Sequence, residues 1–179
     1  MTRLKLLILI ATCFLVQIGV DQALKDNLLG KLEWTALLDP VAHLALALMV
    51  VIPLAMRCKT PRWPVLVALF LALAIDLDHF IAAGSFSIHD AISLPHRPIA
   101  HSFAVALGVA SLCGIIFRSA NAAALAALAL ISHISRDGSG GGSTPMFWPS
   151  DFEWKIPWSW HLGFWLLFSL TNALRCRAA

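Results

Sequence analysis

The 179-residue chain contains no tyrosine, and only 13% of its residues are charged. Soluble domains are about one quarter charged, so this composition excludes an ordinary soluble domain. The net charge of +3 is too small to indicate binding to nucleic acid. The chain also lacks an internal repeat and a long charged tail. Instead, 59% of its residues are hydrophobic, which predicts a single integral membrane domain over residues 1–179.

Apolar runs recur along the chain, and proline-containing segments precede the second, third and fourth of them. The six runs occupy residues 4–20, 41–56, 64–78, 98–117, 121–136 and 159–174. Several are shorter than the roughly 20 residues that a helix needs to cross the hydrocarbon core. The pattern predicts an all-α fold, a polytopic membrane helix bundle with about six transmembrane helices.

Charged residues divide between the two ends of these runs. One end receives eight of the thirteen basic residues and no acid, namely Arg3, Lys5, Arg57, Lys59, Arg62, Arg118, Arg175 and Arg177. The other receives all ten acids, namely Asp21, Asp26, Glu33, Asp39, Asp76, Asp78, Asp90, Asp137, Asp151 and Glu153. The positive-inside rule then predicts a membrane protein with both termini in the cytoplasm and the acidic end facing the outside.

Three smaller signals agree with this topology. The first run has basic residues before it, as a signal peptide has, but no clear small-x-small cleavage site follows, so we expect an uncleaved helix. No cysteine falls at the oxidising end, so we expect no disulfide. Five tryptophans cluster at the outer ends of the runs, where an aromatic belt is expected: Trp34, Trp148, Trp154, Trp158 and Trp160.

All seven histidines fall in the outer half of the predicted bundle, and several lie beside aspartates. The polar residues that gather there are His43, Asp76, Asp78, His79, His96, His101, His133, Asp137 and His161. On a helix, the spacings of Asp76 to His79 and of His133 to Asp137 put each pair on one face. Pro98 suits a first helical position, which would place His101 in the first helical turn and His96 in the loop before it.

Imidazole and carboxylate groups together suit a borderline divalent cation, zinc above all, with manganese or iron as alternatives. The number of candidates allows one ion or two. Each residue also has a simpler interpretation: His89 and His161 as interfacial polar residues, Asp78 as a cap, and His133 with Asp137 as a hydrogen-bonded pair between helices. Because several segments would each need a separate explanation, a shared metal site is the better prediction.

A glycine-rich segment, DGSGGGSTPMFWP at residues 137–149, follows the fifth run directly. Its glycines would let backbone N–H groups approach a phosphate or another anion, although such a run is also typical of a flexible connector. Arg97 and Arg136 are nearby candidates for binding an anion, and Lys155 is a more distant one.

The motifs appear in a familiar order: His43 at a helix start, DLDH at 76–79, HRPIAHS at 96–102 and HISRDGSGGGSTPMFWP at 133–149. Over about residues 40–150 the chain resembles the YdjM-like membrane-bound metal-dependent hydrolases, and it is distantly similar to the helical zinc phospholipase C and P1 nuclease group. The resemblance implies a helical inner-membrane hydrolase with a metal centre, and with the predicted topology its site would face the periplasm. The ligands that it implies are His43, Asp76, Asp78, His79, His96, His101, His133 and Asp137.

The function expected from these observations is hydrolysis of a phosphoester or related bond in a lipid or lipid-linked substrate by metal-activated water. An aspartate that is not a ligand, such as Asp78, Asp137 or Asp76, would act as the general base. Arg97 would hold the anionic part of the substrate. The sequence leaves the oligomeric state open.

Three other functions are weighed against this one. A divalent-metal transporter or storage protein would need polar residues towards the inner face, where the sequence offers little beyond Gln17, Thr12 and a few serines. A b-haem carrier would not call for the aspartates. An intramembrane metalloprotease would need an H-E-x-x-H motif, which the sequence lacks.

Overall fold

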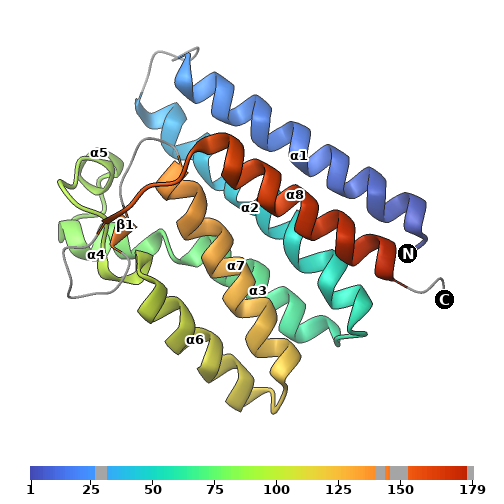
Figure 1. Cartoon of the computed structure of the whole chain (residues 1–179). Coiled ribbons are helices and arrows are strands. Elements are labelled where there is room, and N and C mark those ends of the chain that lie inside the picture. The colour runs from blue at the N-terminus through green and yellow to red at the C-terminus, as the bar shows by residue number, and fades with distance from the viewer. Residues whose placement is uncertain (27–31, 140–143, 146–152, 177–179) are drawn as a thin grey trace.

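The computed structural model describes residues 1–26, 32–139, 144–145 and 153–176, and most of them are helical (Figure 1). The helices are α1 (Arg3–Lys25), α2 (Leu32–Arg57), α3 (Arg62–Ala74), α4 (Leu77–Ala83), α5 (Ile88–Ile92), α6 (Phe103–Ile116), α7 (Ala120–Ser139) and α8 (Trp158–Arg175). A 3₁₀ turn, η1 (Ile99–His101), precedes α6, and the two-residue strands β1 (Thr144–Pro145) and β2 (Glu153–Trp154) pair antiparallel. The predicted all-α fold is confirmed.

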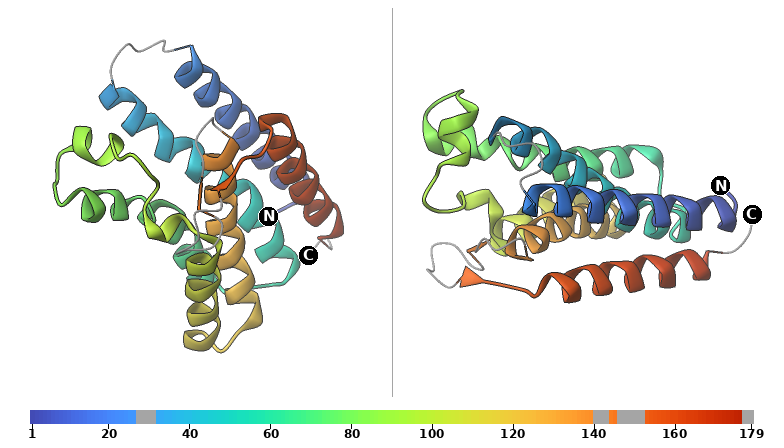
Figure 2. Two further views of the ribbon diagram at one scale, coloured as in Figure 1. Left: turned by 60° about the vertical axis from the view of Figure 1, so that its left-hand side comes forward. Right: turned by 90° about the horizontal axis from the view of Figure 1, so that it is seen from above.

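The long helices lie side by side and define two ends of the bundle (Figures 1 and 2). Both chain ends lie at one end, and α4, α5 and β1 lie at the other. Helix α7 contacts α2, α3, α6 and α8 and is therefore the central element of the bundle. A side chain on α7 can reach groups on most of the other helices.

Small residues allow the central helices to approach closely. Ala47 on α2, Ala68 and Ala72 on α3, and Ala129 on α7 are buried together in one core cluster with Val51 and Leu125. In lipid, helix association depends on such close van der Waals packing, because the surrounding acyl chains are as apolar as leucine. A second cluster joins α1, α2 and α8 around Leu46, Met49 and Trp165.

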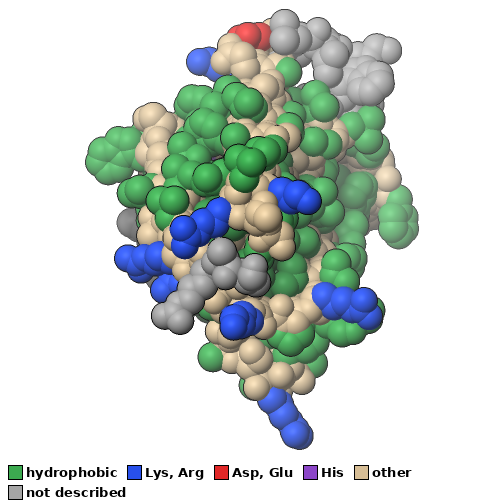
Figure 3. Space-filling view, turned by 90° about the vertical axis from the view of Figure 1, so that its right-hand side faces the viewer, with side chains coloured by type: hydrophobic (Ala, Val, Ile, Leu, Met, Phe, Trp, Pro, Cys, Tyr) green, Lys and Arg blue, Asp and Glu red, His purple; other side chains and the backbone are tan. Residues whose placement is uncertain are grey.

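Within the described residues, three helical stretches are long and apolar enough to cross a membrane: Arg3–Lys25, Ala36–Arg57 and Arg62–Ala83. Helix α6 is also apolar, but its 14 residues make it shorter. Six crossings, and the side on which the termini lie, therefore stay predictions. Figure 3 shows lysine and arginine side chains spread among hydrophobic ones on the face nearest the two chain ends, as the charge pattern predicts.

Two helix boundaries differ from the prediction. Helix α2 begins at Leu32 and contains Pro40. The Asp39-Pro40 pair therefore lies within the helix and does not precede it, as the sequence had indicated. Proline removes one backbone donor and distorts the helix, but a helix embedded among others tolerates it. The third run is broken after Ala74, where i→i+3 hydrogen bonds from Asp78 and His79 tighten the backbone before α4.

The fourth run also begins later than predicted. Pro98 caps η1, and α6 starts only at Phe103. Ser102 explains the boundary, because its backbone is extended (φ −105°, ψ 147°) and its side chain accepts a hydrogen bond from the N–H of Val105. His101 is thus the last residue of the 3₁₀ turn rather than part of the first turn of the helix.

Two glycines of α6 should respond oppositely to the same substitution. A Cβ at Gly114 would lie 2.9 Å from the Cβ of Ala123, whereas a Cβ at Gly108 would meet nothing within 4 Å. We expect Gly108→Ala to raise stability by about 0.5–1 kcal/mol through lower chain entropy. Gly114→Ala should lower it by about 1 kcal/mol or more through overpacking of α6 against α7. Thermal unfolding in detergent, followed by tryptophan fluorescence, measures both, and equal shifts of the same sign would contradict this packing.

Candidate metal centre

Histidine and aspartate side chains from five parts of the chain meet at the end of the bundle opposite the termini. Helix α2 supplies His43, the α3–α4 break supplies Asp76, and η1 supplies His101. Helix α4 supplies Asp78 and His79, and α7 supplies His133 and Asp137. Three groups among the described residues bring one nitrogen or oxygen atom of each member within 4.8 Å of the others, which is close enough to share a metal ion.

The first group is His43, His133 and Asp137, and all three are buried. Nε2 of His43 lies 3.3 Å from one carboxylate oxygen of Asp137, and Nε2 of His133 lies 3.4 Å from the other. The two imidazoles are stacked with their centroids 3.5 Å apart and an interplanar angle of 11°. The four-residue spacing of His133 and Asp137 thus places both on one face of α7, as predicted.

The second group is Asp76, His101 and His133. Oδ1 of Asp76 lies 3.3 Å from Nε2 of His101 and 3.2 Å from Nε2 of His133. His101 also lies 3.5 Å from Oδ2 of Asp137. Asp76 therefore joins the histidines of α7 and η1 rather than His79, its predicted partner. The predicted pairing assumed one continuous helix, and the break after α3 interrupts it between Ala74 and Leu77.

The third group is Asp78, His79 and His101, at the rim of the cluster. One carboxylate oxygen of Asp78 lies 3.2 Å from Nδ1 of His79. The other accepts a hydrogen bond from the N–H of Ala100 and lies 3.4 Å from Nδ1 of His101. His133 belongs to the first and second groups, and His101 belongs to the second and third. The three groups therefore form one continuous cluster.

The environment of His133 indicates that this cluster fits a cation. Nδ1 of His133 lies 2.8 Å from the carbonyl oxygen of Ala72, which can only accept, so Nδ1 carries the proton. In the neutral ring, Nε2 then presents a lone pair to the two carboxylates. Neither Nε2 of His133 nor Oδ2 of Asp137 has a hydrogen-bond partner among the described residues, although both are buried. A positive charge between these acceptors removes the conflict, and a histidine held by a carbonyl is typical of metal ligands.

The carboxylates also act on His101, which lies outside the membrane-spanning stretches. Burial disfavours the charged imidazole and lowers its pKa, but hydrogen bonds to Asp76 and Asp78 and the nearby charge of Asp137 outweigh this effect. The pKa of His101 is therefore raised above its usual value. The same carboxylates that raise this pKa also attract a cation to the cluster.

Arg136 holds the helices around the cluster together. Its guanidinium donates to Asp39 of α2 and Asp21 of α1, both at 2.6 Å, and its Nη1 lies 2.9 Å from Nε2 of His43. Trp158 of α8 donates to the second oxygen of Asp21. We predicted that Arg136 would be available to an anion. That prediction is wrong, because Arg136 is buried and already paired with two carboxylates.

Sequence reasoning missed Asp39 and Asp21 as parts of this arrangement. The four-residue spacing of Asp39 and His43 was a usable signal, because it places both on one face of α2. Oδ2 of Asp39 lies 3.3 Å from Nε2 of His43. Nothing local to Asp21 indicates its partner, which lies 115 residues away.

His96 and Arg97 occupy different positions relative to the cluster. His96 is exposed and belongs to none of the three groups. Arg97 reaches the cluster from the loop before η1, with Nη2 3.4 Å from Oδ1 of Asp137. Its side chain is 29% exposed, so Arg97 lies between the buried aspartate and the outside.

His161 is not the interfacial residue that its sequence position indicates. Because α8 packs against α1 and α7, His161 is 2% exposed. Its Nδ1 lies 3.1 Å from Oγ of Ser135, and its Nε2 lies 3.1 Å from Nε2 of Gln17. Gln17 was expected nearer the inner end of the bundle, and this contact places it beside α8's first turn.

Several predicted features fall partly outside the described residues. Of the glycine-rich segment, only residues 137–139 and 144–145 are described, so its predicted role in binding an anion is not addressed. Of the five belt tryptophans, side chains are described for Trp158 and Trp160 only. They are 40% and 74% exposed and lie at the start of α8, at the same end of the bundle as the cluster. Lys155 is exposed.

Comparison with known proteins gives a family and distant relatives. The profile of a family described as YdjM inner membrane protein matches residues 38–178. Transmembrane protein 267 of Danio rerio is 46% identical over 67 residues, which cover 37% of this chain and 30% of that protein. The Bos taurus protein of the same name is 36% identical over 83 residues, covering 45% and 39%. The chain thus matches less than half the length of these curated relatives. No solved structure is significantly similar.

The position of Arg136 predicts a large loss of stability when its charge is removed. In Arg136→Gln, the carboxylates of Asp21 and Asp39 keep their charge but lose their shared cation. The free energy of unfolding should therefore fall by about 3 kcal/mol or more. Arg57→Gln is the control, because Arg57 is exposed and, within the described residues, donates a hydrogen bond to Asn172. It should cost less than about 1 kcal/mol. Thermal unfolding of both variants decides the matter, and similar melting temperatures would contradict the proposed importance of Arg136.

Proposed function

The chain belongs to the YdjM inner membrane protein family, and on this premise we propose that it is a metal-dependent hydrolase. The proposed centre holds one or two divalent ions, zinc by preference, and cleaves a phosphoester or related bond in a lipid or lipid-linked substrate. Its active site faces the periplasm. The observation that carries the proposal is the buried Nε2 of His133, which has no hydrogen-bond partner in the described part of the chain and faces Asp76 and Asp137.

The donor set determines what the centre would bind. The cluster offers only nitrogen and oxygen ligands, the set that zinc prefers in hydrolytic sites. They come from His43, Asp76, His101, His133 and Asp137. A divalent ion bound there supplies a Lewis acid and a water molecule that ionises near neutral pH. The protein must then supply a proton acceptor and a group that orients the substrate.

Asp78 is the best candidate for the proton acceptor. One of its oxygens is engaged by the N–H of Ala100, whereas the other is buried, lies 3.2 Å from Nδ1 of His79 and makes no hydrogen bond within the described residues. A carboxylate oxygen in this state can accept a proton from water beside the cluster. Asp137 is more deeply enclosed, with its side chain 2% exposed, and suits the role of ligand better.

Arg97 is the best candidate for holding the anionic part of the substrate. It contacts Asp137 through one nitrogen, and a guanidinium carries five N–H donors, so further donors face the outside. The planar arrangement of these donors matches two oxygens of a phosphate group. Arg97 would therefore orient the substrate directly above the buried carboxylate.

Exposed apolar residues beside the cluster favour an amphiphilic substrate. Leu77 and Ile81 on α4, Phe86 after it and Ile99 in η1 are 57%, 80%, 98% and 44% exposed. Large side chains exposed together in this way are typical of contact with a lipid or another apolar surface. A substrate whose acyl chains lie on these residues would bring its head group towards Arg97.

A metal-binding or metal-transport protein without enzymatic activity is the second candidate. Buried polar residues continue along α8 towards the end with the termini, at His161, Ser169 and Asn172. The sequence had indicated few polar residues there. The hydroxyl of Ser169 donates to the carbonyl of Trp165 and the amide of Asn172 to that of Phe168, so both side chains have partners inside their own helix. Flux of zinc into proteoliposomes would favour transport over hydrolysis.

Replacement of His133 tests the proposal most simply. His133→Ala should reduce the metal content of the purified protein to a small fraction of that of the wild type, because the first and second groups both lose a ligand. Hydrolysis of bis(nitrophenyl) phosphate should fall with it. His89→Ala is the control, since His89 is exposed on α5 and contacts Ser93. Unchanged metal content in folded His133→Ala protein, measured by elemental analysis, would contradict the proposal.

Replacement of Asp78 separates catalysis from metal binding. Asp78→Asn keeps the shape of the side chain but removes the proton acceptor, so we expect hydrolysis to fall by about 10²–10⁴-fold. The ion held by His133 and Asp76 should remain. Elemental analysis and the rate of hydrolysis are measured on the same preparation. Full activity of Asp78→Asn would rule out Asp78 as the base and transfer this role to another carboxylate.

A further inference from the structure

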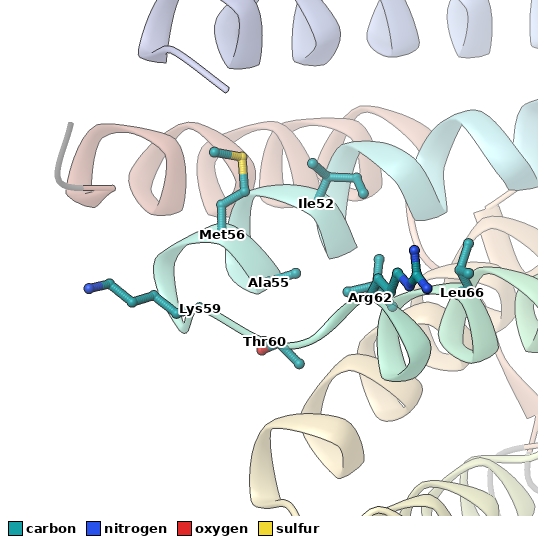
Figure 4. Close-up of a pocket in the computed structure, with 8 residues that line it drawn as sticks. Ile52, Ala55, Met56, Lys59, Thr60, Arg62 and Leu66 are labelled. Carbon is teal, nitrogen blue, oxygen red and sulfur yellow. The ribbon is translucent and has the colours of Figure 1, made fainter. Parts of the chain in front are cut away.

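A hollow opens between α2 and α3 (Figure 4). The turn that joins these helices lies at the end of the bundle with the two termini, opposite the histidine cluster (Figure 1). The volume of the hollow is about 620 Å³. Ile52 and Met56 on α2 and Val65 and Leu66 on α3 form its apolar part. The turn between the two helices supplies polar and basic lining residues, among them Lys59 and Thr60 (Figure 4). The hollow therefore combines an apolar interior with a basic edge.

Lys59 occupies a backbone position that glycine usually fills. Its φ is 51°, in the left-handed region. The turn is a Schellman motif, in which the N–H of Lys59 bonds to the carbonyl of Met56 and the N–H of Thr60 to that of Ala55. A lysine here is less favourable than a glycine. This backbone conformation fixes the position of the Lys59 side chain at the edge of the hollow.

Two further groups at this edge suit an anionic ligand. Arg62 opens α3 and lines the hollow, and its guanidinium lies 5.4 Å from the ring centroid of Trp63, which is 61% exposed. An exposed tryptophan beside an arginine is typical of the interface between membrane and water. Oγ1 of Thr60 is buried and has no hydrogen-bond partner among the described residues. It can donate to a phosphate or ester oxygen.

We propose that this hollow binds an anionic phospholipid, with an acyl chain against Ile52, Val65 and Leu66 and the phosphate beside Lys59 and Arg62. This site is separate from the histidine cluster and does not depend on the proposed hydrolase activity. Basic pockets between membrane helices bind anionic head groups, because the negative surface of the membrane attracts lysine and arginine. The apolar lining requires an acyl chain as well as the charge, which distinguishes a lipid from a soluble anion.

The chain offers a close control for Lys59. Arg118, in the turn between α6 and α7, also has a positive φ, 48°, and the same hydrogen bonds, from Arg118 to Ile115 and from Ser119 to Gly114. It is basic but does not line the hollow. Glycine fits both turns without strain, so Lys59→Gly and Arg118→Gly each remove one charge and preserve the backbone.

Native mass spectrometry of the detergent-purified protein tests the proposal with two lipids of equal chain length, dioleoyl phosphatidylglycerol and dioleoyl phosphatidylcholine. The wild type should retain phosphatidylglycerol in preference. Lys59→Gly and Arg62→Gln should each weaken its binding by about fivefold, the effect of one basic residue at a membrane surface. Arg118→Gly should leave it unchanged.

Three results would overturn the proposal. The first is equal retention of the two lipids by the wild type. The second is a loss of phosphatidylglycerol binding in Arg118→Gly as large as that in Lys59→Gly, which would indicate a general effect of charge. The third is displacement of the lipid by glycerol phosphate at equal concentration, which would indicate a site for soluble anions.

Discussion

The contact on which the candidate site depends is the hydrogen bond from His133 to the carbonyl of Ala72. It places a proton on Nδ1, so that in the neutral ring Nε2 presents its lone pair to Asp76 and Asp137 in a buried space. Two acceptors cannot face each other there without a positive charge between them. The small residues between α3 and α7 bring the two helices close enough for this contact. Packing and site chemistry are therefore coupled through one backbone carbonyl.

Arg136 and Asp137 are neighbours on α7 with different tasks. Asp137 faces the histidines, whereas Arg136 faces the carboxylates of α1 and α2 and lies against His43. The guanidinium neutralises two acids that would otherwise repel Asp137 and compete for the same cation. It also holds α1, which lies outside the family match, against the helices that carry the cluster. The charges thus form two sets. Those around Arg136 hold the helices together, and those around Asp137 are available to a ligand.

Much of this arrangement was predictable from the sequence. Hydropathy and the division of charge indicated the helices, and helical spacing indicated that His133 and Asp137 share a face. The break after Ala74 was not predictable, because Asp76 lies within an unbroken apolar pattern and its partners come from η1 and α7. Ser102 was a local signal for the start of α6 that the neighbouring prolines obscured. The role of Arg136 could not be read from sequence, because a buried and an exposed arginine have the same local pattern.

The central claim is that this cluster binds metal through nitrogen and oxygen. X-ray absorption at the metal edge, on protein purified with its native metal, tests it most directly. The account predicts a stoichiometric ion with nitrogen and oxygen neighbours at about 2.0–2.2 Å and the outer-shell scattering of imidazole. Absence of a stoichiometric metal, or sulfur neighbours at about 2.3 Å from any of the four cysteines, would contradict it.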